Sequence, residues 1–388
     1  MPRLAHKLEH IEPFHVMELV KRAEAMQAAG RDIVHMSIGE PDFTAIPEVV
    51  AALEQAARDG RSQYTPALGL PALREAIARF QGEHFGTPID PARVIVTAGA
   101  SGALTLACAA LLDPGAEVLM ADPAYPCNRH IVTAAGGVPR LIATSAEGRF
   151  QLSARQVATH WHKATAGVIV ASPSNPTGTT IAPAALAELV DEVRARDGFT
   201  LVDEIYLGLS YDQPPRSAAA LGDDVILVNS FSKYFHMTGW RLGWLVVPPA
   251  LVPAFEKLAQ NLVICASALA QHAALACFTP AALAQFEARR AAFQTRRDLV
   301  LSAFERLGLA VPVRPDGAFY VYADVSAHSA DSQAFAEAML RETGVCAVPG
   351  MDFGHVGARR YMRFSYANSV PRLHEAMARL ERWLLSAP

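Results

Sequence analysis

Seven short apolar runs, rich in β-branched residues, recur through the first two thirds of the chain. They cover residues 93–97, 117–121, 138–142, 167–171, 199–203, 224–229 and 242–247. Segments with helical spacing of their apolar positions alternate with most of these runs, as in residues 184–196. Strands that alternate with helices predict an α/β fold in which helices sandwich a mostly parallel, seven-stranded sheet.

A different pattern follows. Residues 281–307 form a long stretch without proline and with many Arg, Ala and Glu residues, which predicts a helix that joins two domains. Two strand-like runs, 318–322 and 361–365, come after it and predict a smaller α+β domain. We expect the N-terminal segment to pack on this smaller unit. The predicted division is a large domain, 46–285, and a small domain made of 1–45 and 286–388.

Composition narrows the class of protein. The 388 residues are 51% hydrophobic, enough for a large core, and the net charge of −4 does not favour nucleic acid or an anionic membrane as a partner. The longest apolar stretches are 98–112, which is too short to span a membrane, and 262–278, which Gln271 and His272 interrupt.

The five cysteines form no CxxC pair and the N-terminus has no apolar signal region, so we expect reduced thiols in a cytoplasmic protein. Neither close histidine pair, 6 and 10 or 160 and 162, has a convincing third ligand, so no metal is predicted.

The most informative segment for chemistry is Ser230-Phe-Ser-Lys233, which continues to Arg241 and Gly243. It follows the apolar run 224–229, so the lysine is predicted just past the carboxyl end of a strand, where α/β sheets place ligands. A lysine amine can form a Schiff base with an aldehyde, while hydroxyls and an arginine can hold a phosphate. Both groups occur in pyridoxal phosphate (PLP). The alternative is a surface loop with a solvated lysine and arginine.

The ends of two further runs offer groups for the PLP ring. Asp203 ends the run 199–203 and is a candidate partner of the protonated pyridine nitrogen, although a helix N-cap is an equal alternative. Tyr206 can donate to the phenolic oxygen of the ring. The amide of Asn175, in the turn Asn175-Pro-Thr-Gly178, can reach the same oxygen, unless the segment is only a turn.

The ends of two further predicted strands give weaker indications of a PLP site. Ala100, Ser101 and Gly102 are small residues between a strand and a helix, where free backbone N–H groups can bind the cofactor phosphate. Close packing of the helix on the strand is the alternative. Tyr125, in Asp122-Pro-Ala-Tyr125-Pro126, can stack on the pyridine ring or be an ordinary half-buried tyrosine.

Taken in this order, the motifs resemble those of the PLP-dependent aminotransferases of class I/II, in the fold-type I (aspartate aminotransferase) superfamily. The resemblance covers nearly the whole chain. Besides the motifs above it rests on Gly39-Glu-Pro-Asp-Phe43, Tyr64-Thr-Pro-Ala-Leu-Gly69, Val348-Pro-Gly350-Met-Asp-Phe353 and Arg363-Phe-Ser-Tyr366.

The resemblance implies roles for these residues. Lys233 would bind PLP covalently and then act as the general base, with Asp203 and Tyr206 as the other catalytic groups. Arg363, assisted by Gly39 and Asn175, would bind the substrate α-carboxylate. Tyr64 would reach the phosphate of the neighbouring subunit, which implies a homodimer. The residues implied to bind the cofactor are Tyr64, Ala100, Ser101, Gly102, Tyr125, Asn175, Asp203, Tyr206, Ser230, Ser232, Lys233 and Arg241.

The chain departs from the family pattern at a few positions. His236 stands where a small residue is usual, and we expect a hydrogen-bonded structural histidine there rather than one that faces the site. Asn128 stands where many relatives carry a tyrosine. Ser101 occupies a position where one aspartate-using subgroup carries a lysine, and no second arginine for a dicarboxylate is evident. These departures favour a neutral amino donor.

The function expected from the resemblance is ping-pong transfer of the amino group from an L-amino acid to a 2-oxo acid, with 2-oxoglutarate or pyruvate as acceptor. One alternative on the same fold is a PLP-dependent C–S β-lyase. Another is a non-enzymatic PLP-binding regulatory domain, which needs an added DNA-binding domain for which the first forty residues leave no room.

Overall fold

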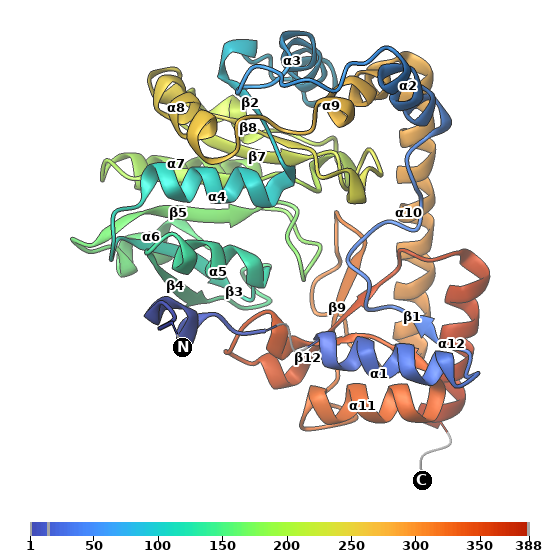
Figure 1. Ribbon diagram of the computed structural model, residues 1–388. Helices are drawn as coiled ribbons and strands as arrows, with labels where there is room; N and C mark the ends of the chain where they lie inside the picture. The colour runs from blue at the N-terminus through green and yellow to red at the C-terminus, as the bar shows by residue number, and fades with distance from the viewer. Residues whose placement is uncertain (1, 14–15, 386–388) are drawn as a thin grey trace.

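The computed structural model describes residues 2–13 and 16–385. A seven-stranded sheet lies at its centre, with strand order β2-β8-β7-β6-β5-β3-β4. All neighbours are parallel except β8, which is antiparallel to both β2 and β7. The mostly parallel, seven-stranded sheet predicted from the sequence is therefore confirmed (Figure 1). Its strands are β2 (Val94–Thr97), β3 (Glu117–Asp122), β4 (Val138–Ala143), β5 (Thr165–Ala171), β6 (Phe199–Asp203), β7 (Ile226–Ser230) and β8 (Gly243–Val246).

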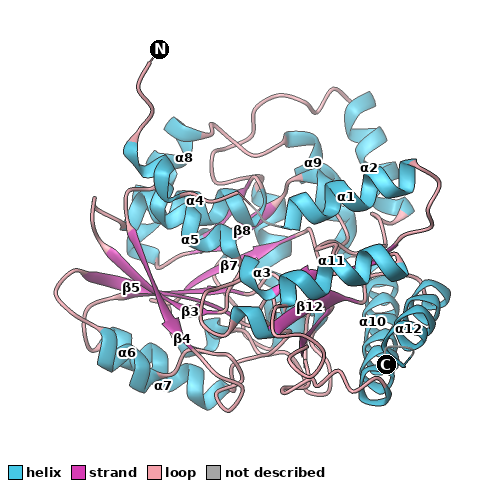
Figure 2. Cartoon of the chain, turned by 90° about the horizontal axis from the view of Figure 1, so that it is seen from below, coloured by secondary structure: helices cyan, strands magenta, loops and turns pink. Residues whose placement is uncertain are grey.

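The strands are apolar on both faces because helices cover both faces. On β5, Val168 and Val170 pack into one core cluster and Ile169 into the other. The first cluster includes apolar side chains of α6 (Ala154–His160) and α7 (Pro183–Arg194). The second contains α4 (Gly99–Leu111), α5 (Pro126–Ala134) and α8 (Val252–Leu262). Figure 2 shows the sheet between these two helical layers.

The helix predicted at 281–307 is α10 (Pro280–Arg306). Thr279 caps it by accepting the amide of Ala282 (3.2 Å), and Pro280 suits its first turn because proline has no N–H to leave unpaired there. In Figure 1 the helix runs from beside α2 (Pro47–Arg58) and α9 (Ala268–Ala274) down to α12 (Val370–Leu385). The remaining long helix on the upper side is α3 (Pro71–Phe85).

A smaller α+β unit contains the predicted C-terminal strands. Strands β11 (Val348–Pro349), β12 (Tyr361–Ser365) and β9 (Tyr320–Asp324) form an antiparallel sheet. The strand predicted at 318–322 starts only at Tyr320, because Ala318 has a left-handed backbone (φ 57°) that interrupts the extended conformation.

Only the later part of the N-terminal segment, residues 17–35, packs on this unit, because η1 (His6–His10) lies against α5, where Lys7 donates to the carbonyl of Ala134 (2.5 Å). β1 (Val34–His35) pairs in parallel with β10 (Val345–Cys346), and α1 (Val16–Ala28) lies beside α11 (Ser332–Thr343) (Figure 1). The division into 1–45 plus 286–388 and 46–285 stays a prediction. Within residues 2–13 and 16–385 no helix is long and apolar enough to cross a membrane, and no group of three or more His, Cys, Asp or Glu is placed to hold a metal ion.

Candidate active site

Most of the predicted site residues meet at the carboxyl edge of the central sheet. The chain leaves β2, β3, β5, β6 and β7 at this edge, and the antiparallel β8 enters there, so Arg241 reaches it from the opposite direction. They line a cavity of about 480 Å³. The sequence-predicted residues in its wall are Gly39, Ala100, Ser101, Tyr125, Asn175, Asp203, Tyr206, Ser232, Lys233, Arg241 and Arg363.

Lys233 lies in the loop that follows β7. Its Nζ donates to the carbonyl oxygen of Gly39 (2.5 Å) and lies 5.7 Å from the centre of the Tyr206 ring. Burial lowers the pKa of the amine to about 8, and the positive charges of Arg363 and Arg241 act in the same direction. The amine therefore loses its proton, and becomes a nucleophile, far more easily than an exposed lysine.

Asp203 is the last residue of β6 and is 5% exposed. One carboxylate oxygen accepts the amide of Ile205 (3.1 Å). Burial raises the pKa of this carboxyl to about 6, although that hydrogen bond and the charge of Lys233 both oppose the rise. A buried carboxylate of this kind is stabilised by a cation placed against it, such as a protonated pyridine.

The turn after Asp203 is held from behind by Glu204, which the sequence analysis did not single out. Its carboxylate accepts the amide of Ala218 (2.6 Å) and the hydroxyl of Ser217 (2.9 Å), and Gln81 donates to that hydroxyl (2.6 Å). Burial raises the pKa of Glu204 to about 7. These bonds fix the backbone that carries Asp203 and Tyr206.

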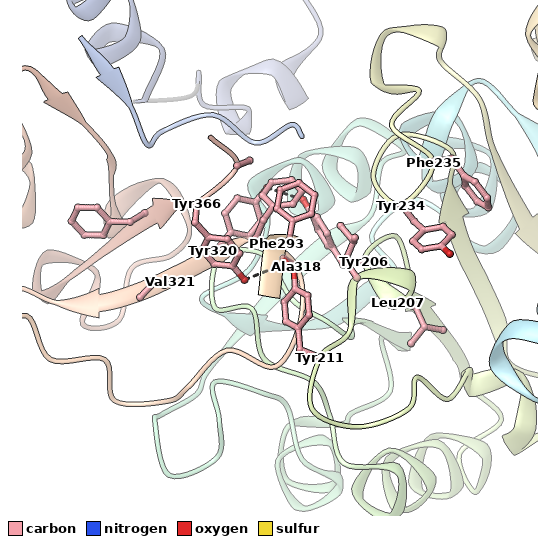
Figure 3. Close-up of a cluster of buried hydrophobic side chains, with 14 of the residues drawn as sticks. Tyr206, Leu207, Tyr211, Tyr234, Phe235, Phe293, Ala318, Tyr320, Val321 and Tyr366 are labelled. Atoms are coloured by element: carbon pink, nitrogen blue, oxygen red, sulfur yellow. Dashed lines mark hydrogen bonds between the residues drawn. The ribbon is translucent and has the colours of Figure 1, made fainter. Parts of the chain in front are cut away.

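Tyr206 lies three residues beyond Asp203 and is buried. Its hydroxyl lies 2.8 Å from the hydroxyl of Tyr320, on β9, and burial raises the pKa of both phenols. Sequence reasoning missed Tyr320, because it stands inside an apolar run that reads only as a buried strand. The two tyrosines lie together in the buried cluster drawn in Figure 3.

Arg363 projects from β12 towards the cavity and is 6% exposed. Its guanidinium donates to the side-chain oxygen of Asn175 (2.9 Å) and to the carbonyl of Ser37 (2.7 Å). Its Nε and the Ser37 hydroxyl are buried without a hydrogen-bond partner among the described residues. The planar cation is thus held at the cavity wall with donor capacity left over, which suits a carboxylate ligand.

The start of α4 forms a narrow cradle with Arg241. A Cβ added at Gly99 would lie 2.7 Å from Nη2 of Arg241, and one added at Gly243 would lie 2.9 Å from the amide nitrogen of Ala100. Gly99 also has a left-handed backbone (φ 72°), which favours glycine. The guanidinium therefore lies against the helix N-terminus, where backbone N–H groups attract an anion.

Two serines extend the cradle. Ser232 lines the cavity, and its amide donates to the hydroxyl of Ser230 (3.0 Å). Ser230 is 1% exposed and lies behind Ser232 rather than in the cavity wall. Of the other predicted cofactor residues, Gly102 lies in the first turn of α4 outside the lining, and Tyr64 is 80% exposed and does not line this chain's own cavity.

Two of the departures from the family pattern, Asn128 and His236, lie outside the cavity lining, whereas Ser101 is part of it. Asn128 is buried on α5. His236 is 2% exposed and packs against Phe43, Phe286 and Phe293, with ring centroids 5.3, 5.9 and 6.2 Å away. The expected structural position of His236 is confirmed, but the expected hydrogen bonds are wrong: neither ring nitrogen has a partner among the described residues, because aromatic rings surround it.

Fold and site together define an α/β enzyme with a half-buried lysine, a buried carboxylate, an anion cradle and an arginine clamp in one cavity. The family described as "Aminotransferase class I and II" matches residues 31–380. The chain belongs to this family, whose members use PLP and act on amino acids and 2-oxo acids.

Individual relatives and solved structures similar to this chain are also named as aminotransferases. The "Valine--pyruvate aminotransferase" of Mycobacterium tuberculosis is 40% identical over 378 residues, which is 97% of each chain. The "Crystal structure of an aminotransferase from Mycobacterium tuberculosis" covers 100% of both chains at 39% identity, with a TM-score of 0.95. The aspartate aminotransferase from Thermus thermophilus, solved with maleate, is 34% identical, covers 98% of this chain and 100% of its own, and has a TM-score of 0.92.

Proposed function

We propose that this aminotransferase binds PLP through Lys233 and moves the amino group of a neutral, aliphatic L-amino acid to pyruvate or 2-oxoglutarate in a ping-pong reaction. The observation that carries the proposal is the shared cavity, in which the low-pKa amine of Lys233, the buried carboxylate of Asp203 and the Arg241 cradle face one space.

The residues present fit the cofactor. The backbone at Ala100 and Ser101, the hydroxyl of Ser232 and the guanidinium of Arg241 would hold its phosphate, with Ser230 and Gly102 in support. The carboxylate of Asp203 would pair with the ring nitrogen, Tyr206 and Asn175 would donate to the phenolic oxygen, and Tyr125 would stack on the ring. When bound, PLP supplies an aldehyde for the substrate amine and an electron sink for the charge that develops at Cα.

The chain's own groups supply positioning and proton transfer. Arg363 binds the α-carboxylate of the amino acid, and its hydrogen bonds to Asn175 and Ser37 fix the orientation of the guanidinium. Lys233, once its amine is free, removes the proton from Cα, and its lowered pKa suits a base that works near neutral pH.

The cavity wall supports a neutral donor. Its apolar members include Met17, Val20, Ile38, Val348 and Phe353. Among the described residues that line it, the cationic side chains are Lys233, Arg241 and Arg363, each of which already has a proposed role. A second carboxylate on the substrate would thus lie against apolar side chains without a cation to pair with it, which is costly. The relative named as a valine–pyruvate aminotransferase supports an aliphatic donor and pyruvate as an acceptor.

Product analysis tests the proposal. Purified protein with PLP is incubated with valine, leucine, methionine, phenylalanine or aspartate, each with pyruvate or 2-oxoglutarate, and with alanine and 2-oxoglutarate, and the products are identified by mass spectrometry. We expect a 2-oxo acid from the aliphatic donors in equal amount to the amino acid made from the acceptor. Release of pyruvate and ammonia from cysteine conjugates without an acceptor would indicate the β-lyase instead, and preference for aspartate would contradict the neutral donor.

We propose further that the protein is a homodimer in which Tyr64 completes the phosphate site of the neighbouring subunit. Its 80% exposure and its position outside this chain's own cavity lining support that role. Mixing inactive Lys233→Ala and Tyr64→Ala chains tests it, because a mixed dimer would contain one site with both residues. Recovery of activity on mixing is expected, and no recovery in a mixed dimer would refute the shared site.

A further inference from the structure

Tyr320 touches two groups that have separate roles in the proposed function. It is fully buried on β9 and pairs across the small sheet with Ser365 of β12. Its hydroxyl lies 2.8 Å from the hydroxyl of Tyr206, and its ring centre lies 4.4 Å from the guanidinium carbon of Arg363. One side chain therefore joins the group that would face the cofactor to the group that would bind the substrate.

Either hydroxyl can be the donor in the contact between Tyr206 and Tyr320, so the donor depends on where each hydroxyl proton is used. A tyrosine hydroxyl has one proton to donate and lone pairs to accept with. If Tyr206 donates to the phenolic oxygen of the cofactor, its proton is used there, so Tyr320 must donate in the 2.8 Å contact. A hydroxyl that accepts a hydrogen bond becomes a stronger donor, because linked hydrogen bonds polarise one another in a buried site.

The Tyr320 ring also fixes the guanidinium plane. Asn175 and Ser37 hold two of the nitrogens of Arg363, while the rings of Tyr320 and Phe353 lie against the cation at 4.4 and 4.9 Å. A buried cation in contact with aromatic rings is restrained in its orientation and stabilised by the ring electrons. Such a plane presents its remaining donors to a carboxylate without further ordering of the side chain.

We propose that Tyr320 is a positioning residue for the transamination, which donates its hydroxyl proton to Tyr206 and supports the Arg363 guanidinium through its ring. The inference rests on the proposed function. Its two parts separate in mutagenesis, since Tyr320→Phe removes the hydroxyl and keeps the ring, whereas Tyr320→Leu removes both. The charged and titratable groups around the two phenols are Arg363 from β12, Tyr125 at the start of α5 and Lys233 from the loop after β7.

The first readout is the pH titration of the absorbance band of the Lys233-bound cofactor. A strong hydrogen-bond donor to the phenolic oxygen stabilises the deprotonated form of the Lys233-bound cofactor. It therefore lowers the pKa at which the absorbance band changes. Tyr320→Phe is expected to raise the band's pKa by about half a pH unit. Tyr366→Phe is the matched control, because its buried hydroxyl donates to the carbonyl of Ala318 (3.2 Å) in the same cluster but outside the cavity lining (Figure 3). The control is expected to leave the band's pKa unchanged.

The second readout is the split between KM and kcat for the amino acid. Tyr320→Leu is expected to raise KM roughly tenfold, since a desolvated cation–ring contact is lost. Tyr320→Phe is expected to change KM by less than about threefold, because that contact remains. Thermal denaturation of each variant checks that the chain is folded.

The outcomes distinguish this inference from the proposed function. If the unmodified protein forms no Lys233-dependent band with PLP, the proposed function fails and the inference with it. If the band forms but its pKa is the same in Tyr320→Phe as in the unmodified protein, the hydroxyl relay is wrong while the proposed function stands. Equal KM values for Tyr320→Leu and the unmodified protein would overturn the role in holding Arg363.

Discussion

The guanidinium of Arg363 on β12 donates to the side-chain oxygen of Asn175, 188 positions earlier in the chain, over 2.9 Å. This bond joins the small antiparallel sheet to the turn after β5 in the central sheet. We expect Asn175→Ala to raise KM for amino acids by roughly 10- to 100-fold, because the loss of a hydrogen bond to a buried charge costs about 1.5–3 kcal/mol. Steady-state kinetics measure the effect.

Asn261→Ala is the control for that prediction, since Asn261 lies on α8 and donates only locally, to the carbonyl of Lys257 (2.7 Å). An unchanged KM in the Asn175 variant would mean that the bond does not orient Arg363 for the substrate.

The rate at which the cofactor-free protein takes up PLP should depend on the protonation of Lys233. Its pKa is lowered to about 8 by burial and neighbouring cations, and only the neutral amine attacks an aldehyde. The loading rate should therefore rise as pH increases through about 8 and level off above it. Stopped-flow absorbance measures the rate, with Nα-acetyl-lysine in the same buffers as the control for PLP itself. A rise that continues past pH 10 would show an amine with the ordinary lysine pKa.

The contact between Gly99 and Arg241 predicts a specific loss in Gly99→Ala. The added Cβ would lie 2.7 Å from Nη2 and push the guanidinium away from the helix start. Gly115→Ala is a matched control, because its φ of 85° is also left-handed but nothing lies within 4 Å of the added atom. Both variants should lose about 1 kcal/mol of stability from backbone strain. The affinity for PLP, measured by equilibrium dialysis, should fall roughly tenfold or more in the first alone. Equal affinities would contradict the cradle.

His236 should make the protein less stable in mild acid. Its burial among aromatic rings, with Arg289 and Arg296 nearby, lowers its pKa from 6.5 to about 3. Below pH 6.5 the unfolded chain takes up a proton that the folded chain does not, so stability falls by up to about 1.4 kcal/mol per pH unit down to about pH 3. We expect a shallower fall in the free energy of unfolding for His236→Phe than for the unmodified protein between pH 6.5 and 4.5. Chemical denaturation measures it, His6→Phe on the exposed η1 helix (His6–His10) serves as the control, and parallel slopes would refute the assignment.

Much of the fold was predictable because its signals are local. Buried parallel strands read as apolar β-branched runs, and α10 has its start signals, Thr279 and Pro280, next to each other. Strand ends also identified cavity residues such as Asp203 and Lys233, since a parallel sheet brings the carboxyl ends of its strands together, whereas Gly39 and Arg363 followed only from the resemblance to the family. Tyr320 and Ser37 escaped prediction for the opposite reason. Their roles come from contacts with Tyr206 and Arg363, which are distant in sequence, and no local pattern distinguishes them from core residues.

The spectrum of the half-reaction tests the central claim most directly. The protein is purified with PLP, its cofactor absorbance is recorded, and valine is added without any oxo acid. We predict that the Lys233-dependent band converts to that of the aminated cofactor and that pyruvate restores it, while Lys233→Ala shows neither change. A band that does not respond to any amino acid, or one that forms equally well in Lys233→Ala, would contradict the account.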